Sequence, residues 1–258
     1  MQIDFTSLLQ EQLSAPFRLA LEVRAPWEHG AGIATRPLLS LAPRGDGHPV
    51  LVLPLLLGSD LTMQPLRQVL RKQGYAATGW GLGVNLGPRS GTFDACLQRL
   101  RDLNLEHGRK VSLVGWSLGG LYARAMALKA PELVRQVISL GTPLRGPVAP
   151  AELWRIVQRT SGQPMGLPEE IGPLDQSLPV PASALFSRSD GIVPWRHSLE
   201  PTGPQAENIE IISSHFGLGA HPLALYAIAD RLAQPEDRWR PFDRTGFSEW
   251  LYPRQGRF

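Results

Sequence analysis

Residues 111–120 read VSLVGWSLGG, and the rest of the chain can be placed around them. The first four residues have the mostly aliphatic, alternating character of a short strand, which ends at Gly115. Beyond Gly120 the apolar residues recur with helical spacing, at Leu121, Tyr122, Ala125, Met126 and Leu128. A strand therefore passes into a helix through a Gly-x-Ser-x-Gly turn around Ser117. Such a turn lifts the serine hydroxyl above the edge of a sheet, beside the free N–H groups of the helix start. The segment predicts a nucleophilic serine at position 117.

Strands and helices are expected to alternate along the chain on both sides of this turn. The predicted strands are 49–54, 75–80, 111–114, 133–140, 182–187 and 208–212. The predicted helices are 62–73, 93–106, the helix that follows Ser117, and 223–232. Alternation of this kind is typical of an α/β fold with a mostly parallel central sheet and helices on both faces.

The chain is expected to form one domain over residues 1–258, with three additions to its core. Residues 1–45 contain an amphipathic helix at 5–13 and a second at 17–23, which either pack on the core or dock on a partner or a membrane surface. Residues 143–181 are rich in proline, with one short helix expected at 151–158, and are interpreted as a cap or lid. The aromatic tail 235–258 is expected to pack back on the body.

Composition narrows the possible functions of the chain. The net charge is only +3, and no basic stripe with interleaved aromatic residues is present, so nucleic acid is not an expected partner. The single cysteine, Cys96, excludes a disulfide within the chain and a cysteine metal site. No stretch has the form of a signal peptide or the length of a membrane span, so we expect a soluble, cytoplasmic protein.

A glycine-rich segment at residues 79–88 reads GWGLGVNLGP. Its spacing is not that of a dinucleotide-binding Gly-x-Gly-x-x-Gly turn, and no helix begins there at once. We therefore interpret it as a loop on the rim of the site and not as a nucleotide-binding loop.

A nucleophilic serine needs a neighbouring base, and the base needs an orienting carboxylate. Of the histidines beyond Ser117, His215 follows a predicted strand directly, where the loop returns to the carboxyl edge of the sheet. His215 is the favoured base and His221, at the start of a helix, is the second choice. His197 lies too close in sequence to the favoured acid, Asp190, to reach the serine easily.

Asp190 is favoured as the acid because it follows a strand directly, in the turn Ser-Asp-Gly-Ile-Val-Pro. Asp175 lies in the proline-rich segment and Asp230 in a late helix, so both fit the role poorly. A turn-capping aspartate is the alternative interpretation of Asp190.

The combination of these segments resembles the α/β-hydrolase superfamily, and in detail the bacterial serine esterases and lipases of that fold. The motifs that carry the resemblance lie within residues 49–234: VLVLP at 50–54, SD at 59–60, GWGLG at 79–83, GWSLGG at 115–120, GTP at 141–143, SDGIVP at 189–194 and SHFG at 214–217. The family order of nucleophile, acid and histidine implies a Ser117, His215 and Asp190 triad. It implies cleavage of small carboxylic esters of apolar character through an acyl-enzyme, with no cofactor and no metal.

The resemblance also implies an oxyanion hole made by the N–H groups of Leu56 and Leu118. One departure concerns Leu55, which stands where the family has a glycine. A leucine resists positive φ, so we expect the hole to be incompletely formed in the free protein. Four apolar side chains are candidates for the lining of the substrate pocket: Leu55, Trp116, Trp195 and Phe216.

Two other functions remain compatible with the sequence. The same triad supports acyl transfer to an alcohol or a thiol in place of hydrolysis. A binding protein that keeps the fold without turnover is the other possibility, and Leu55 is the one feature in its favour.

Overall fold

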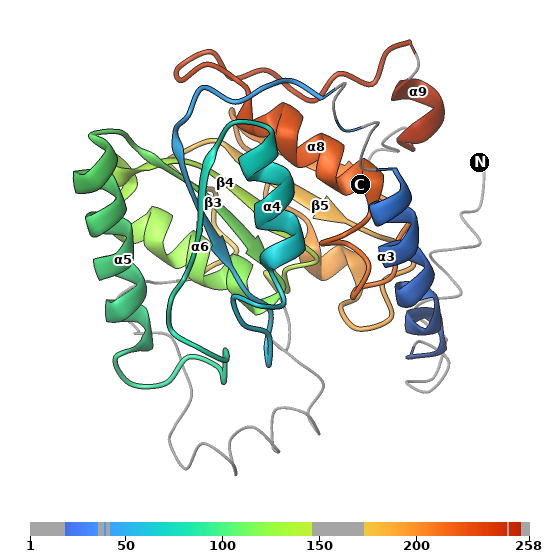
Figure 1. Cartoon of the computed structure of the whole chain (residues 1–258), viewed down its shortest axis with the longest axis horizontal. Coiled ribbons are helices and arrows are strands. Elements are labelled where there is room, and N and C mark those ends of the chain that lie inside the picture. The colour runs from blue at the N-terminus through green and yellow to red at the C-terminus, as the bar shows by residue number, and fades with distance from the viewer. Residues whose placement is uncertain (1–18, 36–38, 40–41, 146–172, 247, 254–258) are drawn as a thin grey trace.

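The computed structural model describes residues 19–35, 39, 42–145, 173–246 and 248–253. At its centre lies one sheet of six parallel strands in the order β2-β1-β3-β4-β5-β6 (Figure 1). The strands are β1 (Pro49–Leu53), β2 (Ala76–Gly79), β3 (Val111–Trp116), β4 (Val134–Leu140), β5 (Ala182–Phe186) and β6 (Ala206–Glu210). The predicted α/β fold with a parallel central sheet is confirmed.

Helices cover both faces of this sheet. The longer helices are α3 (Ala25–Ala34), α4 (Gln64–Lys72), α5 (Thr92–His107), α6 (Leu118–Lys129) and α8 (Pro222–Leu232). The short helices are η1 (Leu21–Arg24), η3 (Pro131–Leu133), η5 (Trp195–Ser198) and α9 (Ser248–Leu251). One core cluster includes buried side chains of α4 and α8, and the other includes those of α5 and α6.

The side chains of β1 alternate between the two core clusters. Val50 and Val52 belong to the cluster under α4 and α8, whereas Leu51 and Leu53 belong to the cluster under α5 and α6. Successive side chains of a strand point to opposite faces, so a strand covered on both sides is apolar at every position. The continuous apolar run that marks β1 in the sequence has this cause.

The described N-terminal residues contain a helix that the sequence pattern did not predict. A helix was expected at 17–23, but η1 is followed by α3, which continues to Ala34. Helix α3 contains two glycines and a proline, which have low helix propensity, so propensity does not predict a helix there. Gly32 has a packing reason, because a Cβ atom there would lie 2.1 Å from the carbonyl oxygen of Ala220.

Several expectations fall partly or wholly outside the described residues. These are the helices at 5–13 and 151–158 and most of the proposed cap. The described part of the tail does pack on the body, since Phe242 and Tyr252 are buried in the core with ring centroids 4.7 Å apart. None of the described helices is long and apolar enough to span a membrane, and the cytoplasmic location stays a prediction.

Candidate active site

Ser117 lies in the tight turn between β3 and α6. Its φ of 53° and ψ of −118° place a non-glycine residue in a strained region of backbone conformation. The turn is held by a hydrogen bond from the Ser117 N–H to the Leu140 carbonyl, at 2.8 Å. A Cβ atom at Gly115 would lie 2.4 Å from the Gly119 carbonyl oxygen, and one at Gly119 would lie 2.3 Å from the Leu53 carbonyl oxygen. The glycines of the motif are therefore required by close backbone approaches.

His215 and Asp190 form a buried, hydrogen-bonded pair. The His215 Nδ1 atom lies 2.7 Å from Asp190 Oδ2. The other carboxylate oxygen, Oδ1, accepts the N–H groups of Ile192 and Val193, both at 2.8 Å. Because the turn occupies Oδ1, the carboxylate presents Oδ2 to the histidine and orients its ring.

The structure brings this pair to the strand edge where Ser117 lies. A Cβ atom at Gly141, directly after β4, would lie 3.0 Å from Asp190 Oδ2 and 3.1 Å from His215 Nδ1. The residue before Gly141 accepts the Ser117 N–H, and the residue before Ser117, Trp116, donates its indole N–H to the His215 carbonyl at 3.2 Å. The three predicted residues therefore lie at the same edge of the sheet, after the carboxyl ends of β3, β5 and β6.

The electrostatics of the pair favour a basic imidazole. Burial lowers the pKa of His215, but the charge and the hydrogen bond of Asp190, with the charge of Glu22 added, outweigh burial and raise the pKa above its usual value. A raised pKa suits a group that must take a proton from a serine hydroxyl.

The competing candidates have other contacts. His221 is the N-cap of α8, where its Nδ1 accepts the Leu223 N–H at 3.3 Å, and burial lowers its pKa. His197 lies in η5, and its carbonyl accepts the Leu144 N–H at 2.8 Å. Asp175 and Asp230 form ion pairs with arginine side chains, Arg145 and Arg231 respectively.

Comparison with known proteins identifies the fold family of the chain. A family model described as "alpha/beta hydrolase fold" matches residues 30–165, which is more than half of the chain. The chain belongs to the α/β-hydrolase fold family. It is similar to the mature form of Bacillus licheniformis lipase BlEst2, with 19% identity and a TM-score of 0.52 over 72% of this chain and 91% of that one. The propeptide form of that lipase gives 18% identity and a TM-score of 0.55, over 78% of this chain and 53% of that one.

A third similar structure is an alpha/beta superfamily hydrolase from Oenococcus oeni PSU-1. It has 15% identity and a TM-score of 0.51, over 72% of this chain and 91% of that one. At these identities the likeness shows a shared fold.

The loop after β1, where the oxyanion hole is predicted, differs from the sequence expectation. Leu55 has no positive φ, and the left-handed residue is Leu57, at φ 62°. The conflict expected at Leu55 therefore does not arise there, because the loop turns two residues later. Among the described residues, the hydrogen bonds of the loop use the N–H groups of Leu57 and Gly58, and not that of Leu56.

Asn85 holds this loop in place and was missed by sequence reasoning. Its side chain donates to the Pro54 carbonyl at 2.7 Å, its carbonyl accepts the Leu57 N–H at 2.7 Å, and its N–H donates to the Gly58 carbonyl at 2.7 Å. The glycine-rich segment 79–88 therefore supports the loop that follows β1. The available signal in the sequence was an asparagine within a glycine-rich segment, because asparagine side chains often bond backbone groups in turns.

The four pocket candidates do not share one environment. Leu55, Trp116 and Trp195 are buried, and only Phe216 is exposed, at 42%. Trp195 stacks on Phe186, with ring centroids 5.8 Å apart, and the guanidinium groups of Arg188 and Arg196 lie over its ring. Trp116 packs in the core and contacts the His215 carbonyl, and Trp195 is enclosed by these partners, so a role of either tryptophan in a pocket wall stays a prediction.

Three charged residues near the pair were also missed, namely Glu22, Arg24 and Glu28. They come from η1 and α3 and contact the loops that carry Asp190 and His215. The contacts join residues more than 160 positions apart, so no local pattern announces them.

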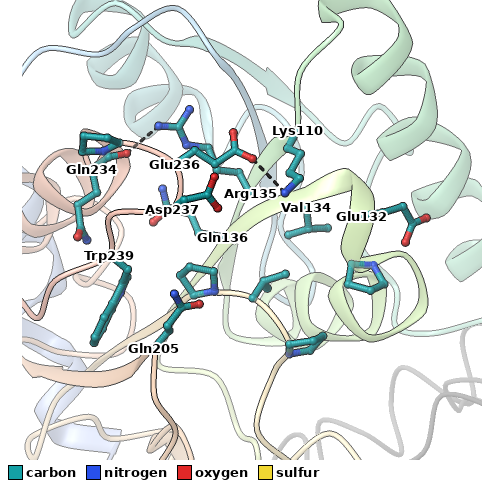
Figure 2. A pocket seen from close by; sticks show the side chains of 15 residues that line it. Lys110, Glu132, Val134, Arg135, Gln136, Gln205, Gln234, Glu236, Asp237 and Trp239 are labelled. Atoms are coloured by element: carbon teal, nitrogen blue, oxygen red, sulfur yellow. Dashed lines mark hydrogen bonds and ion pairs between the residues drawn. The ribbon is translucent and has the colours of Figure 1, made fainter.

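A cleft of about 420 Å³ lies at the opposite end of the sheet (Figure 2). It is lined by residues at the starts of β3 and β4 and by residues 234–237 and 239, and an ion pair of 3.0 Å joins Lys110 to Glu236. In parallel α/β sheets the carboxyl ends of the strands carry the ligand site, so this cleft is separate from the candidate active site.

Proposed function

We propose that this α/β hydrolase cleaves carboxylic esters of apolar character with Ser117, His215 and Asp190. The observation that carries the proposal is the buried His215–Asp190 pair, with 2.7 Å between Nδ1 and Oδ2, packed against Gly141 beside the strained turn of Ser117. A nucleophile, a base and an orienting acid are the three groups that acyl transfer through serine requires.

The steps follow from the roles of these groups. The Ser117 hydroxyl attacks the ester carbonyl while the free nitrogen of His215 takes its proton, and Asp190 stabilises the imidazolium. The N–H groups of Leu118, at the start of α6, and Leu56 donate to the oxyanion of the tetrahedral intermediate. The imidazolium protonates the leaving alcohol. His215 then takes a proton from water, which attacks the acyl-enzyme. The imidazolium returns this proton to Ser117 as the acid leaves.

Exposed apolar side chains at the carboxyl edge support an apolar ester. They belong to the loops that follow β1, β2 and β6, and comprise Leu57, Leu61, Leu82, Val84 and Phe216. An apolar rim favours a substrate whose acyl or alcohol part is also apolar. Lipases among the structures of similar fold agree with this choice of substrate class.

A panel of p-nitrophenyl esters of increasing acyl length, run with a serine-directed phosphonate probe, tests the proposal. We expect hydrolysis of apolar esters and covalent labelling of Ser117. Labelling without hydrolysis, but with ester formed when a competing alcohol is added, would assign the protein to acyl transfer. Neither labelling nor turnover would assign it to binding.

A further inference from the structure

The carboxylate of Glu22 joins the loop of Asp190 to the loop of His215. Its Oε1 atom accepts the N–H of Gly191 at 2.8 Å and the N–H of His215 at 2.9 Å, and its Oε2 atom accepts the N–H of Phe216 at 3.0 Å. One carboxylate thus takes amide groups from the residue after the acid, from the base itself and from the residue after the base. Hydrogen bonds to a charged acceptor are stronger than those to a neutral one.

A second connection from the same N-terminal segment runs parallel to the first. Glu28 accepts the Ser214 N–H at 3.0 and 3.1 Å, and also the hydroxyl groups of Ser213 and Ser214. Arg24 donates to Glu28 at 3.1 Å and to the carbonyl and hydroxyl oxygens of Ser189 at 2.8 and 2.6 Å. The segment therefore contacts the residues on both sides of Asp190 and on both sides of His215. Figure 1 shows α3 beside the loops that carry these two residues.

These contacts act on the separation and angle of the Asp190–His215 pair. The two residues sit on separate loops, after β5 and after β6, so their hydrogen bond depends on how the loops are held together. We propose that Glu22 is a positioning residue for the base: its carboxylate fixes His215 against Asp190 and adds negative charge beside the imidazolium that forms during turnover. The proposal rests on the proposed function, because it takes His215 as the base.

Within the described part of the chain, few charged groups pack around His215. Asp190 approaches from the β5 loop, and Glu22 and the Glu28–Arg24 pair approach from the N-terminal segment. The negative charges of Asp190 and Glu22 both raise the pKa of His215, against the effect of burial. Removal of the Glu22 charge should therefore lower the pH at which the base becomes protonated.

The test compares the wild type with Glu22→Gln and Val69→Ala in the hydrolysis of p-nitrophenyl butyrate across pH. Gln keeps the size of Glu but loses the charge and one acceptor oxygen. We expect Glu22→Gln to lower kcat about tenfold with KM little changed, because a small misplacement of a catalytic group lowers the rate and Glu22 does not touch the substrate. The acid limb of kcat/KM should also move to lower pH.

Val69→Ala supplies the stability control, since Val69 is a buried core residue of α4. It should lower the melting temperature and leave kcat and the acid limb unchanged. The proposal is overturned if Glu22→Gln behaves in the same way, with a lower melting temperature and an unchanged kcat and pH profile.

A Glu22→Asp variant decides the question if Glu22→Gln does not fold. Asp keeps the charge on a shorter side chain, so we expect a lower kcat with the acid limb close to that of the wild type. An unchanged kcat overturns the proposal.

An NMR titration of His215 in a Ser117→Ala background needs no turnover. The pKa of His215 should fall when Glu22→Gln is added, and an unchanged value overturns the added-charge role. Wild-type rates of hydrolysis in Ser117→Ala itself would instead refute the proposed function, and the titration would still judge Glu22.

Discussion

Two groups of serine, histidine and aspartate side chains stand out among the described residues, one at each end of the sheet, and each contains a hydrogen-bonded His–Asp pair. At the carboxyl edge, His215 and Asp190 lie beside Ser117. At the amino edge, His48 lies between Asp46 and Ser112, with its Nδ1 at 2.5 Å from Asp46 Oδ1 and its Nε2 at 2.8 Å from Ser112 Oγ. Residue type and a His–Asp hydrogen bond therefore do not distinguish the proposed active site from the second group.

Backbone placement is the first difference between the two arrangements. Ser112 lies inside β3 and is 0% exposed, whereas Ser117 lies past the end of the same strand, in a strained turn, and is 7% exposed. A substrate can approach only the second serine, because a strand within a covered sheet offers no access to its side chains.

Charge is the second difference. Burial lowers the pKa of His48 to about 4, and the nearby Arg135 and Arg109 help to offset the opposite effect of Asp46. The Asp46 carboxylate also forms ion pairs with both arginines. His48 is therefore neutral at pH 7 and a poor base, whereas Asp190 and Glu22 make His215 a better one.

The largest predicted contrast concerns the two serines. Ser117→Ala should lower the rate of ester hydrolysis by about 10⁴-fold or more and leave the fold intact. Ser112→Ala should leave kcat within about twofold and lower the free energy of unfolding by about 1–3 kcal/mol, because it leaves a buried nitrogen of His48 without its partner. Steady-state kinetics and urea unfolding of both variants measure the contrast. An equal loss of activity in Ser117→Ala and Ser112→Ala would contradict this prediction.

The second prediction separates the base from the helix cap. His215→Ala should lower kcat by about three or more orders of magnitude, since a triad without its base keeps only binding and the oxyanion hole. His221→Ala removes the cap of α8 and should cost about 1 kcal/mol of stability with a much smaller effect on kcat. An inactive His221→Ala and an active His215→Ala would reverse the assignment.

The third prediction uses pH to show that His48 is structural. Its pKa is about 4 in the folded protein against an ordinary 6.5, so the unfolded chain binds a proton over this range and the folded chain does not. The stabilisation is complete above pH 6.5 and is lost as the pH falls from 6.5 to 4, by on the order of 3 kcal/mol.

Urea unfolding between pH 4 and 7 measures this loss. His48→Gln should be less stable than the wild type at pH 7 and should show a flatter dependence on pH over the same window. If the free energies of unfolding of the wild type and of His48→Gln change in parallel between pH 4 and 7, the prediction that His48 is neutral and structural is wrong.

The smallest predicted effect concerns the strain at the carboxyl edge. Leu57 holds a φ of 62° and its side chain is exposed, so Leu57→Gly relieves strain and removes little packing. The greater freedom of glycine in the unfolded chain offsets part of the gain, and stability should rise by about 0–1 kcal/mol. A clear fall in the urea midpoint would show that the leucine side chain supports the loop.

The fold could be predicted because its signals are local. The six strands are short apolar runs between turn residues, and four helices show helical spacing, so each was found within a few residues of its bounds. Helix α3 was missed since its glycines and proline argue against a helix, although Gly32 is there for a close contact with Ala220.

The chemistry of the site was only partly accessible in the same way. Ser117, Asp190 and His215 follow strand ends, and strand ends of a parallel sheet meet at one edge. The support around them comes from contacts that leave no pattern, such as Glu22 with the His215 loop or Asn85 with residue 54. The His48 arrangement was not predicted because His48 precedes Ser117, whereas the family order places the base after the nucleophile.

The link between Glu22 and His215 spans 193 residues and sets an order of events during synthesis. Glu22 is synthesised 193 residues before His215, whose amide group it binds. At about 5–20 residues per second, roughly 10–40 s separate the two. During that interval the amide groups of His215 and Phe216 do not yet exist, so Glu22 can hold the proposed base only after residue 216 has been made.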